Sequence, residues 1–195
     1  ADLFASKKLV PAKPYTGFST LATALAPVWD QYDAHYFIMA TGIVVRTIAP
    51  LIRDKTRDPA VVCGDEAGNF VISLISGHIG GANELAVKLS DLLGTTPVVT
   101  TGTDVNQVPA IDIIARDQEL YIENKRAIKH VNMAFIRGEP LAVHDPFNLV
   151  TPHLVPALMH DSTFFGGEKT GIWVDYTVRN LPEKVLVLRP KMLVA

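Results

Sequence analysis

Short apolar runs alternate along the first half of the chain with stretches of helical periodicity. The runs have the length of buried strands and lie at 34–40, 60–64, 69–75 and 96–101. Residues 65–68, with the sequence Asp-Glu-Ala-Gly, separate the second run from the third, which is the signal for a hairpin. The pattern therefore predicts strands that are joined partly by a hairpin and partly by helices.

Two helices are predicted clearly. Apolar residues at 82, 85, 86, 89, 92 and 93 repeat with helical spacing, and Gly94 is a natural C-cap. Residues 123–138 form the second helix, which Gly138 ends. A shorter helix is expected over 19–29, where Pro27 should end or distort it. Another is expected after Thr41 as N-cap, apolar on nearly all sides and therefore buried.

The second half of the chain has a less regular pattern with fewer clear elements. Residues 101–117 are rich in turn formers and read as a long connection. Weaker strands are expected at 140–144, 171–175 and 185–189. We expect an α/β protein with a layered, open and mostly parallel sheet that has helices on its faces, plus a second, smaller α/β domain. The expected boundaries are 1–117 for the N-terminal domain and 118–195 for the smaller one.

Composition narrows the class of protein. The chain has 195 residues, is 48% hydrophobic and 19% charged, and carries a net charge of −2. A disordered chain is excluded, and the charge balance shows no nucleic-acid footprint. No apolar run reaches the roughly 18 residues of a membrane helix. Cys63 is the single cysteine, so no internal disulfide forms, and we expect a cytoplasmic protein without a signal peptide.

The joint between the third strand and the 82–93 helix concentrates candidate chemistry. Its residues are Ser76, Gly77, His78, Gly80, Gly81, Asn83 and Glu84. Glycines allow close approach to the backbone, and the first N–H groups of a helix form an anion site. The spacing matches neither a dinucleotide fingerprint nor a P-loop. Two interpretations stay open: the glycines bind a carboxylate or phosphate, or they only permit tight strand–helix packing.

His78 and Glu84 are candidate acid–base residues at this joint. A histidine in a turn beside an anion site titrates near neutrality, but it can equally hydrogen-bond its own loop. Glu84 lies in the first helical turn, where it either complements the helix dipole or reaches into the site. The six histidines show no metal-binding spacing, so a protein-bound metal is not expected.

Two further strand-to-helix joints resemble the first. The residues concerned are Thr41, Gly42 and Arg46 in one, and Thr101, Thr103 and Asp104 in the other. Several such joints in one small sheet predict a shared cleft for a polyanionic ligand. Asp104 is a base, an orienting partner of His78 or an Asx-turn residue, and its position favours the turn.

Three segments in this order and spacing resemble the CbiG family, the cobalt-precorrin-5A hydrolases of anaerobic cobalamin biosynthesis. They are FIMATGIVVRTIAPLI, DEAGNFVISLISGHIGGANELA and TPVVTTGTDVNQVPAID. The resemblance is strong over 34–112 and looser through 122–140. Family members usually start with another strand and helix and end with a further C-terminal domain. The chain is thus expected to be a piece, or a separately encoded version, of such a protein.

The resemblance implies a function. The enzyme would open the δ-lactone of cobalt-precorrin-5A and release acetaldehyde, giving cobalt-precorrin-5B. Cobalt would arrive with the substrate, and no protein cofactor is expected. The carboxylate rim of the corrinoid would meet the three joints, including Ser76, Asn83, Thr101 and Thr103. N–H groups of the glycine turn would hold the oxyanion, with His78, Glu84 or Asp104 as the acid–base group.

Partners and alternatives follow from the same resemblance. A homodimer, a C-terminal domain and other cobalamin-pathway enzymes are the expected partners, without nucleic acid or membrane. A non-catalytic corrinoid-binding module is the alternative function. A sugar- or nucleotide-phosphate binder that uses the same glycine joint is a third.

Overall fold

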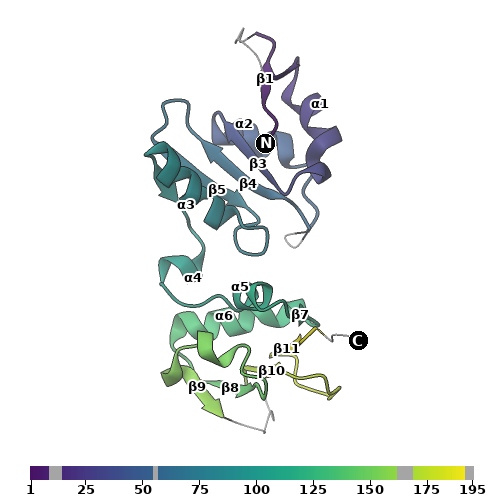
Figure 1. Cartoon of the computed structure of the whole chain (residues 1–195), viewed down its shortest axis with the longest axis vertical. Helices are drawn as coiled ribbons and strands as arrows, with labels where there is room; N and C mark the ends of the chain where they lie inside the picture. Colours follow the sequence, from purple (N-terminus) through teal and green to yellow (C-terminus); the bar gives the residue numbers. More distant parts are fainter. Residues whose placement is uncertain (9–14, 55–56, 162–168, 192–195) are drawn as a thin grey trace. The chain divides into compact units, whose positions relative to one another are not determined.

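The computed structural model describes residues 1–8, 15–54, 57–161 and 169–191, and it divides the chain into two compact units (Figure 1). The first unit is Ala1–Val99 and the second is Thr100–Ala195. The expected boundary was residue 117, but residues 100–117 belong to the second unit. The reason is packing, because Ile111, Ile114 and Ala115 are buried in the second unit's core.

The first unit is built on a four-stranded sheet in chain order. Its strands are β3 (Ala34–Ile38), β4 (Ala60–Gly64), β5 (Phe70–Ile75) and β6 (Thr96–Val98). β3 pairs with β4 and β5 with β6 in parallel, whereas β4 and β5 are antiparallel. The expected hairpin is therefore confirmed. Asp65 closes it by accepting N–H bonds from Ala67, Asn69 and Phe70.

Helices cover both faces of this sheet. α1 (Leu21–Leu25) and α2 (Thr41–Ile48) enclose one core together with Phe37, Val61 and Cys63. α3 (Ala82–Leu93) covers the other face, where Ala82 and Ala86 pack on Val62 and Val71 (Figure 1). A short parallel pair, β1 (Phe4–Ser6) and β2 (Thr16–Phe18), forms a separate sheet.

Two local expectations in the first unit have clear outcomes. Pro27 distorts the first helix as expected, because α1 passes into the 3-10 helix η1 (Ala26–Gln31). The expectation that α2 is buried on nearly all sides is wrong. Val44 and Ile48 are buried, whereas Ile43 and Val45 are 51% and 44% exposed. A helix on the face of a sheet buries one stripe, whatever the hydrophobicity of its other side.

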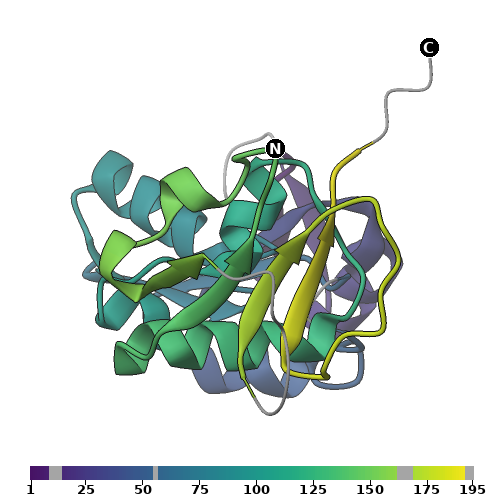
Figure 2. The ribbon, with the colours of Figure 1, turned by 90° about the horizontal axis from the view of Figure 1, so that it is seen from below.

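The second unit has a five-stranded sheet in the order β7-β11-β10-β8-β9 (Figure 2). The strands are β7 (Tyr121–Ile122), β8 (Leu141–His144), β9 (Met159–Asp161), β10 (Gly171–Val174) and β11 (Val185–Arg189). Three of the four pairings are parallel, and only β7 runs antiparallel to its neighbour. The expected α/β class with mostly parallel sheets is confirmed for both units.

Helices α5 (Ile111–Asp117) and α6 (Ile128–Arg137) enclose the main core of the second unit against one face of its sheet. The remaining elements are α4 (Gly102–Val105) and the 3-10 helices η2 (Lys125–Ala127), η3 (Thr151–His153) and η4 (Pro156–Leu158). The long connection expected over 101–117 is wrong, since α4 and α5 occupy it. On the opposite face, Trp173 packs with Val185, Val187 and Leu181.

The described residues contain no helix that is long and apolar enough to cross a membrane. The same residues hold no group of three or more histidine, cysteine or acidic side chains arranged to take a metal ion.

Candidate functional site

The turn between β5 and α3 is unusually compact. The register of β5 against β4 shifts between Val61 and Val62, and Ser76, directly after β5, has a positive φ of 58°. Gly81, the N-cap of α3, has a φ of 84°, a conformation that glycine adopts without strain. The chain thus reverses from strand to helix within a few residues.

The turn supplies its own acceptors for the first amides of α3. The N–H of Ala82 donates to the Ser76 carbonyl at 3.1 Å, and the N–H of Asn83 donates to the Gly77 carbonyl at 3.0 Å. Gly81 N–H donates to the carbonyl of His78 at 3.0 Å. These three amides therefore do not form the open anion site that the helix start predicted, because the loop already occupies them.

The glycines also have a packing role. A Cβ on Gly80 would come within 2.8 Å of the Ser76 carbonyl oxygen, and one on Gly77 within 2.7 Å of Asn83 Oδ1. Tight packing, one of the two open interpretations, is thus confirmed for both positions. Among the described residues, no backbone acceptor is shown for the N–H of Gly77, Ile79 or Gly80. These amides are the remaining backbone donors of the half-buried turn, and an anion contact with them stays a prediction.

Asn83 belongs to the core of the turn. It is buried, with 7% of its surface exposed, and its Oδ1 accepts a 2.7 Å hydrogen bond from Ser73 Oγ. This bond joins β5 to the first turn of α3. Asn83 therefore holds the strand and the helix together, and the ligand contact expected of it stays a prediction.

The two candidate acid–base residues of the turn differ in setting. His78 is half-buried in the middle of the loop. Glu84 is exposed and forms an ion pair of 2.7 Å with Lys88, one helical turn further along α3. The pair lies along the exposed side of the helix, which makes His78 the stronger candidate of the two.

The joint after β3 is arranged differently from its prediction. Ala40, not Thr41, is the N-cap of α2, and Thr41 Oγ1 donates to Cys63 Sγ at 3.7 Å. Arg46 folds back along the helix, and its Nη1 donates to the Gly42 carbonyl at 3.0 Å. The expected N-cap role of Thr41 is therefore wrong, because its hydroxyl points towards the sheet.

Strand register separates this joint from the glycine turn. Ile38, the last residue of β3, aligns with Gly64, whereas Ile75, the last residue of β5, aligns with Val61 and so with His35. At about 3.3 Å per residue, the two strand ends lie roughly 10 Å apart along the strands. Beyond these ends the two joints leave opposite edges of the sheet. The expected shared cleft of these two joints is wrong, because the hairpin reverses the chain.

The third joint lies in the second unit. Thr101 is the N-cap of α4, and its Oγ1 donates to Asp104 Oδ2 at 2.6 Å. Thr103 is buried and also donates to Asp104, at 3.5 Å. Asp104 thus accepts hydroxyl hydrogen bonds from two neighbours, and the Asx turn that its position favoured stays a prediction. A catalytic role for it stays a prediction.

Sequence reasoning overlooked a second group of side chains, at the carboxyl ends of β8 and β10. His144 Nε2 lies 2.8 Å from Asp175 Oδ2, and the His144 ring stacks on Trp173 with centroids 3.8 Å apart. The hydrogen bond from His144 holds the pKa of Asp175 below its ordinary value. The available signal was that each residue ends or follows a strand, in LAVHD and in IWVDY.

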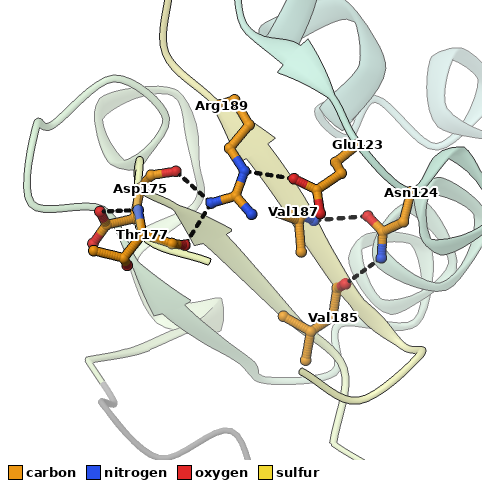
Figure 3. A network of polar contacts seen from close by, with 7 residues as sticks. All are labelled: Glu123, Asn124, Asp175, Thr177, Val185, Val187 and Arg189. Carbon is orange, nitrogen blue, oxygen red and sulfur yellow. Dashed lines mark hydrogen bonds and ion pairs between the residues drawn. The ribbon is translucent and has the colours of Figure 1, made fainter. Parts of the chain in front are cut away.

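Arg189 at the end of β11 fixes the loop that carries Asp175 (Figure 3). Its Nη1 donates to the carbonyls of Asp175 and Thr177 at 2.7 and 2.6 Å, and its Nε contacts Glu123 Oε2 at 2.6 Å. The side chain of Asn124 hydrogen-bonds the backbone of β11 as a paired strand would: its Nδ2 donates to the Val185 carbonyl, and its Oδ1 accepts the N–H of Val187. These bonds tie the residues that follow β7 and β10 to β11.

Two family descriptions match the chain. Residues 23–104 match the model described as Cobalamin synthesis G N-terminal, and residues 109–190 match the one described as Cobalamin biosynthesis central region. A cobalt-precorrin-5A hydrolase of Salmonella typhimurium is 51% identical over 116 residues, which cover 59% of this chain and 33% of that protein. The enzyme of that name from Priestia megaterium is 38% identical over 127 residues, covering 65% and 34%.

A solved structure of a cobalamin biosynthesis protein G homolog from Sulfolobus solfataricus aligns with a TM-score of 0.46 and 26% identity, over 91% of this chain and 51% of that one. The chain spans about a third of the length of the curated relatives that it matches. The two matched models occupy nearly all of it from residue 23 to residue 190. The chain belongs to the CbiG family, of which it carries the N-terminal and central regions.

Proposed function

We propose that this chain provides the N-terminal and central regions of a cobalt-precorrin-5A hydrolase. The observation that carries the proposal is the 51% identity, over 116 residues, to the protein of that name from Salmonella typhimurium. The reaction opens the δ-lactone of cobalt-precorrin-5A with water and then releases a two-carbon unit as acetaldehyde by cleavage of a C–C bond. Cobalt enters and leaves as part of the substrate.

The glycine turn is the proposed site of lactone opening. The N–H groups of Gly77 and Gly80 are donors suited to the oxyanion that forms when water attacks the carbonyl. His78, between them in the loop, takes the proton of the attacking water, and Glu84 is the second candidate for that task. A positioned base of this kind contributes about 10²–10⁴-fold to the rate.

The other predicted contacts serve the carboxylate rim of the corrinoid. Thr41, Gly42 and Arg46 lie at the opposite edge of the first sheet, so they bind a different part of the ligand, or a second protein. Thr101, Thr103 and Asp104 are proposed separately, as the carboxylate contacts of the second unit by itself. We further propose that the protein works in the cytoplasm without a bound cofactor, with the family's C-terminal region or another copy of itself as partner.

Acetaldehyde release from cobalt-precorrin-5A tests the proposal directly. The purified protein should turn the substrate over, and His78→Ala should lower the rate at least about 10²-fold. Glu84→Gln separates the second candidate, and Lys88→Gln is its control, because it breaks the same ion pair without removing the carboxylate. Binding of the substrate without acetaldehyde would refute the hydrolase and favour a carrier of corrinoids.

A further inference from the structure

His144 and Asp175 form an acid–base pair at the carboxyl edge of the second unit's sheet. A carboxylate only accepts hydrogen bonds, so Nε2 of a neutral His144 carries the proton in its 2.8 Å contact with Asp175. Nδ1 then keeps the basic lone pair, and the described residues show no hydrogen bond to it. The side chain of His144 is 22% exposed, so a ligand can reach it.

The imidazole is held in one orientation. His144 and Trp173 are register partners on parallel strands, and their rings stack at an interplanar angle of 17°. Trp173 is buried, with 2% of its surface exposed, so its ring is a fixed surface against which the imidazole stacks. The carboxylate of Asp175 and the ring of Trp173 thus fix the orientation of the imidazole. An acid–base catalyst requires such a fixed orientation of its reacting nitrogen, which here is Nδ1.

The loops that follow the two strands offer contacts for a flat anionic ligand. Phe147 and Tyr176 meet edge to face at 5.2 Å and are 44% and 45% exposed. Arg179 is exposed and lies 4.8 Å from the Trp173 ring. Aromatic rings and a cation beside a histidine match a conjugated macrocycle that carries carboxylates.

A purely structural ion pair would tie β8 to the loop after β10. That loop is already held without His144: Arg189 binds the carbonyls of Asp175 and Thr177, and Thr177 N–H donates to Asp175 Oδ1 at 3.0 Å (Figure 3). Asp175 is therefore fixed from its own side, and its Oδ2 orients His144. The loop therefore holds its position without His144, whereas the orientation of His144 depends on Asp175 in that loop.

We propose that His144 is the acid–base residue for the C–C cleavage step, with Asp175 and Arg189 as positioning residues, which rests on the proposed function. After the lactone has opened, the two-carbon unit bears a hydroxyl. His144 Nδ1 takes the hydroxyl proton, the C=O bond of acetaldehyde forms, and the C–C bond to the macrocycle breaks. The bond pair passes into the conjugated macrocycle, and the proton leaves His144 to solvent.

The test uses the full-length protein and measures the two chemical steps separately. His144→Gln should still open the lactone, so a species heavier by one water accumulates in the mass spectrum, while acetaldehyde release falls about 10²-fold or more. Imidazole added to His144→Ala should restore acetaldehyde release, which a structural role would not allow. His153→Gln, an exposed histidine of the same unit, is the control and should behave as wild type.

Each outcome decides the matter. Wild-type acetaldehyde release in His144→Gln, or equal loss of both steps without rescue by imidazole, overturns the role of His144 and leaves the proposed function standing. A wild type that neither opens the lactone nor releases acetaldehyde refutes the proposed function, and the role of His144 with it. Accumulation of the opened lactone together with rescue establishes the role.

Discussion

Asn83 Oδ1 lies so close to Gly77 that a Cβ on that glycine would come within 2.7 Å of it. The same oxygen accepts a hydrogen bond from the hydroxyl of Ser73 at 2.7 Å, and a move away from Gly77 would disturb this bond. A strand residue, a turn glycine and a buried helix amide therefore form one interlocked joint. Two predictions test this joint, and two test the contacts of Asp145 and Arg189 in the second unit.

Gly80→Ala should destabilise the protein by about 1–3 kcal/mol, because the new methyl group would collide with the Ser76 backbone. The Ser76 carbonyl also accepts the N–H of Ala82, so the collision disturbs the start of α3. Urea unfolding measures the loss. Gly81→Ala is the matched control: it has open space but a φ of 84°, so it should cost only the backbone strain of about 1–2 kcal/mol. A Gly80→Ala protein as stable as wild type contradicts the clash.

Asn83→Ala should cost about 1–3 kcal/mol, since it leaves the Ser73 hydroxyl without its acceptor. Ser73→Ala alone should cost less, and the double variant should fall short of the sum by about 0.5–3 kcal/mol. Denaturant unfolding of all four proteins gives this coupling. Strict additivity would show that the two side chains do not stabilise each other.

Asp145→Asn should destabilise the protein at neutral pH by about 1–3 kcal/mol. The Asp145 carboxylate accepts the N–H groups of Leu149, Val150 and Thr151 and the hydroxyl of Thr151. Partial burial alone would raise its pKa, but these bonds outweigh burial and lower the pKa from its ordinary value.

The pH dependence of this effect has a defined sign. A lowered folded-state pKa means that the stabilisation is complete above the unfolded value of about 3.9 and is lost as the pH falls through the folded value. The difference in unfolding free energy between wild type and Asp145→Asn should therefore stay constant from pH 7 to about pH 5 and shrink at pH 3. A difference that is unchanged at pH 3 would contradict the carboxylate's role.

Arg189→Lys should cost about 1–3 kcal/mol, because one ammonium group cannot reach Glu123 and two carbonyls in the guanidinium geometry. Arg137→Lys is the control: its 3.7 Å contact with Glu139 is exposed and should be worth less than about 1 kcal/mol. Thermal unfolding of both variants compares them. Equal stability of the two variants would show that the Arg189 contacts add nothing beyond an exposed ion pair.

Local patterns were sufficient for much of the fold. The helical repeat and Gly94 predicted α3 and its end, and the Asp65–Gly68 segment predicted the hairpin. The same hairpin argues against the shared cleft expected from the sequence. An antiparallel pair places the ends of β4 and β5 at opposite edges, so Thr41 and Ser76 were never candidates for one edge. Residues 101–117 were misjudged because their turn formers obscured the short apolar repeat of α5.

The sequence by itself determined most of the strands, the helices α3 and α6, and the glycine joint between β5 and α3, because these depend on neighbours a few residues apart. Only the tertiary structure decided which chain ends meet. His144 and Asp175 are 31 residues apart, and they lie together because β8 and β10 pair in parallel with their carboxyl ends aligned. Strand order and register come from burying two whole faces of a sheet, so no local pattern contains them.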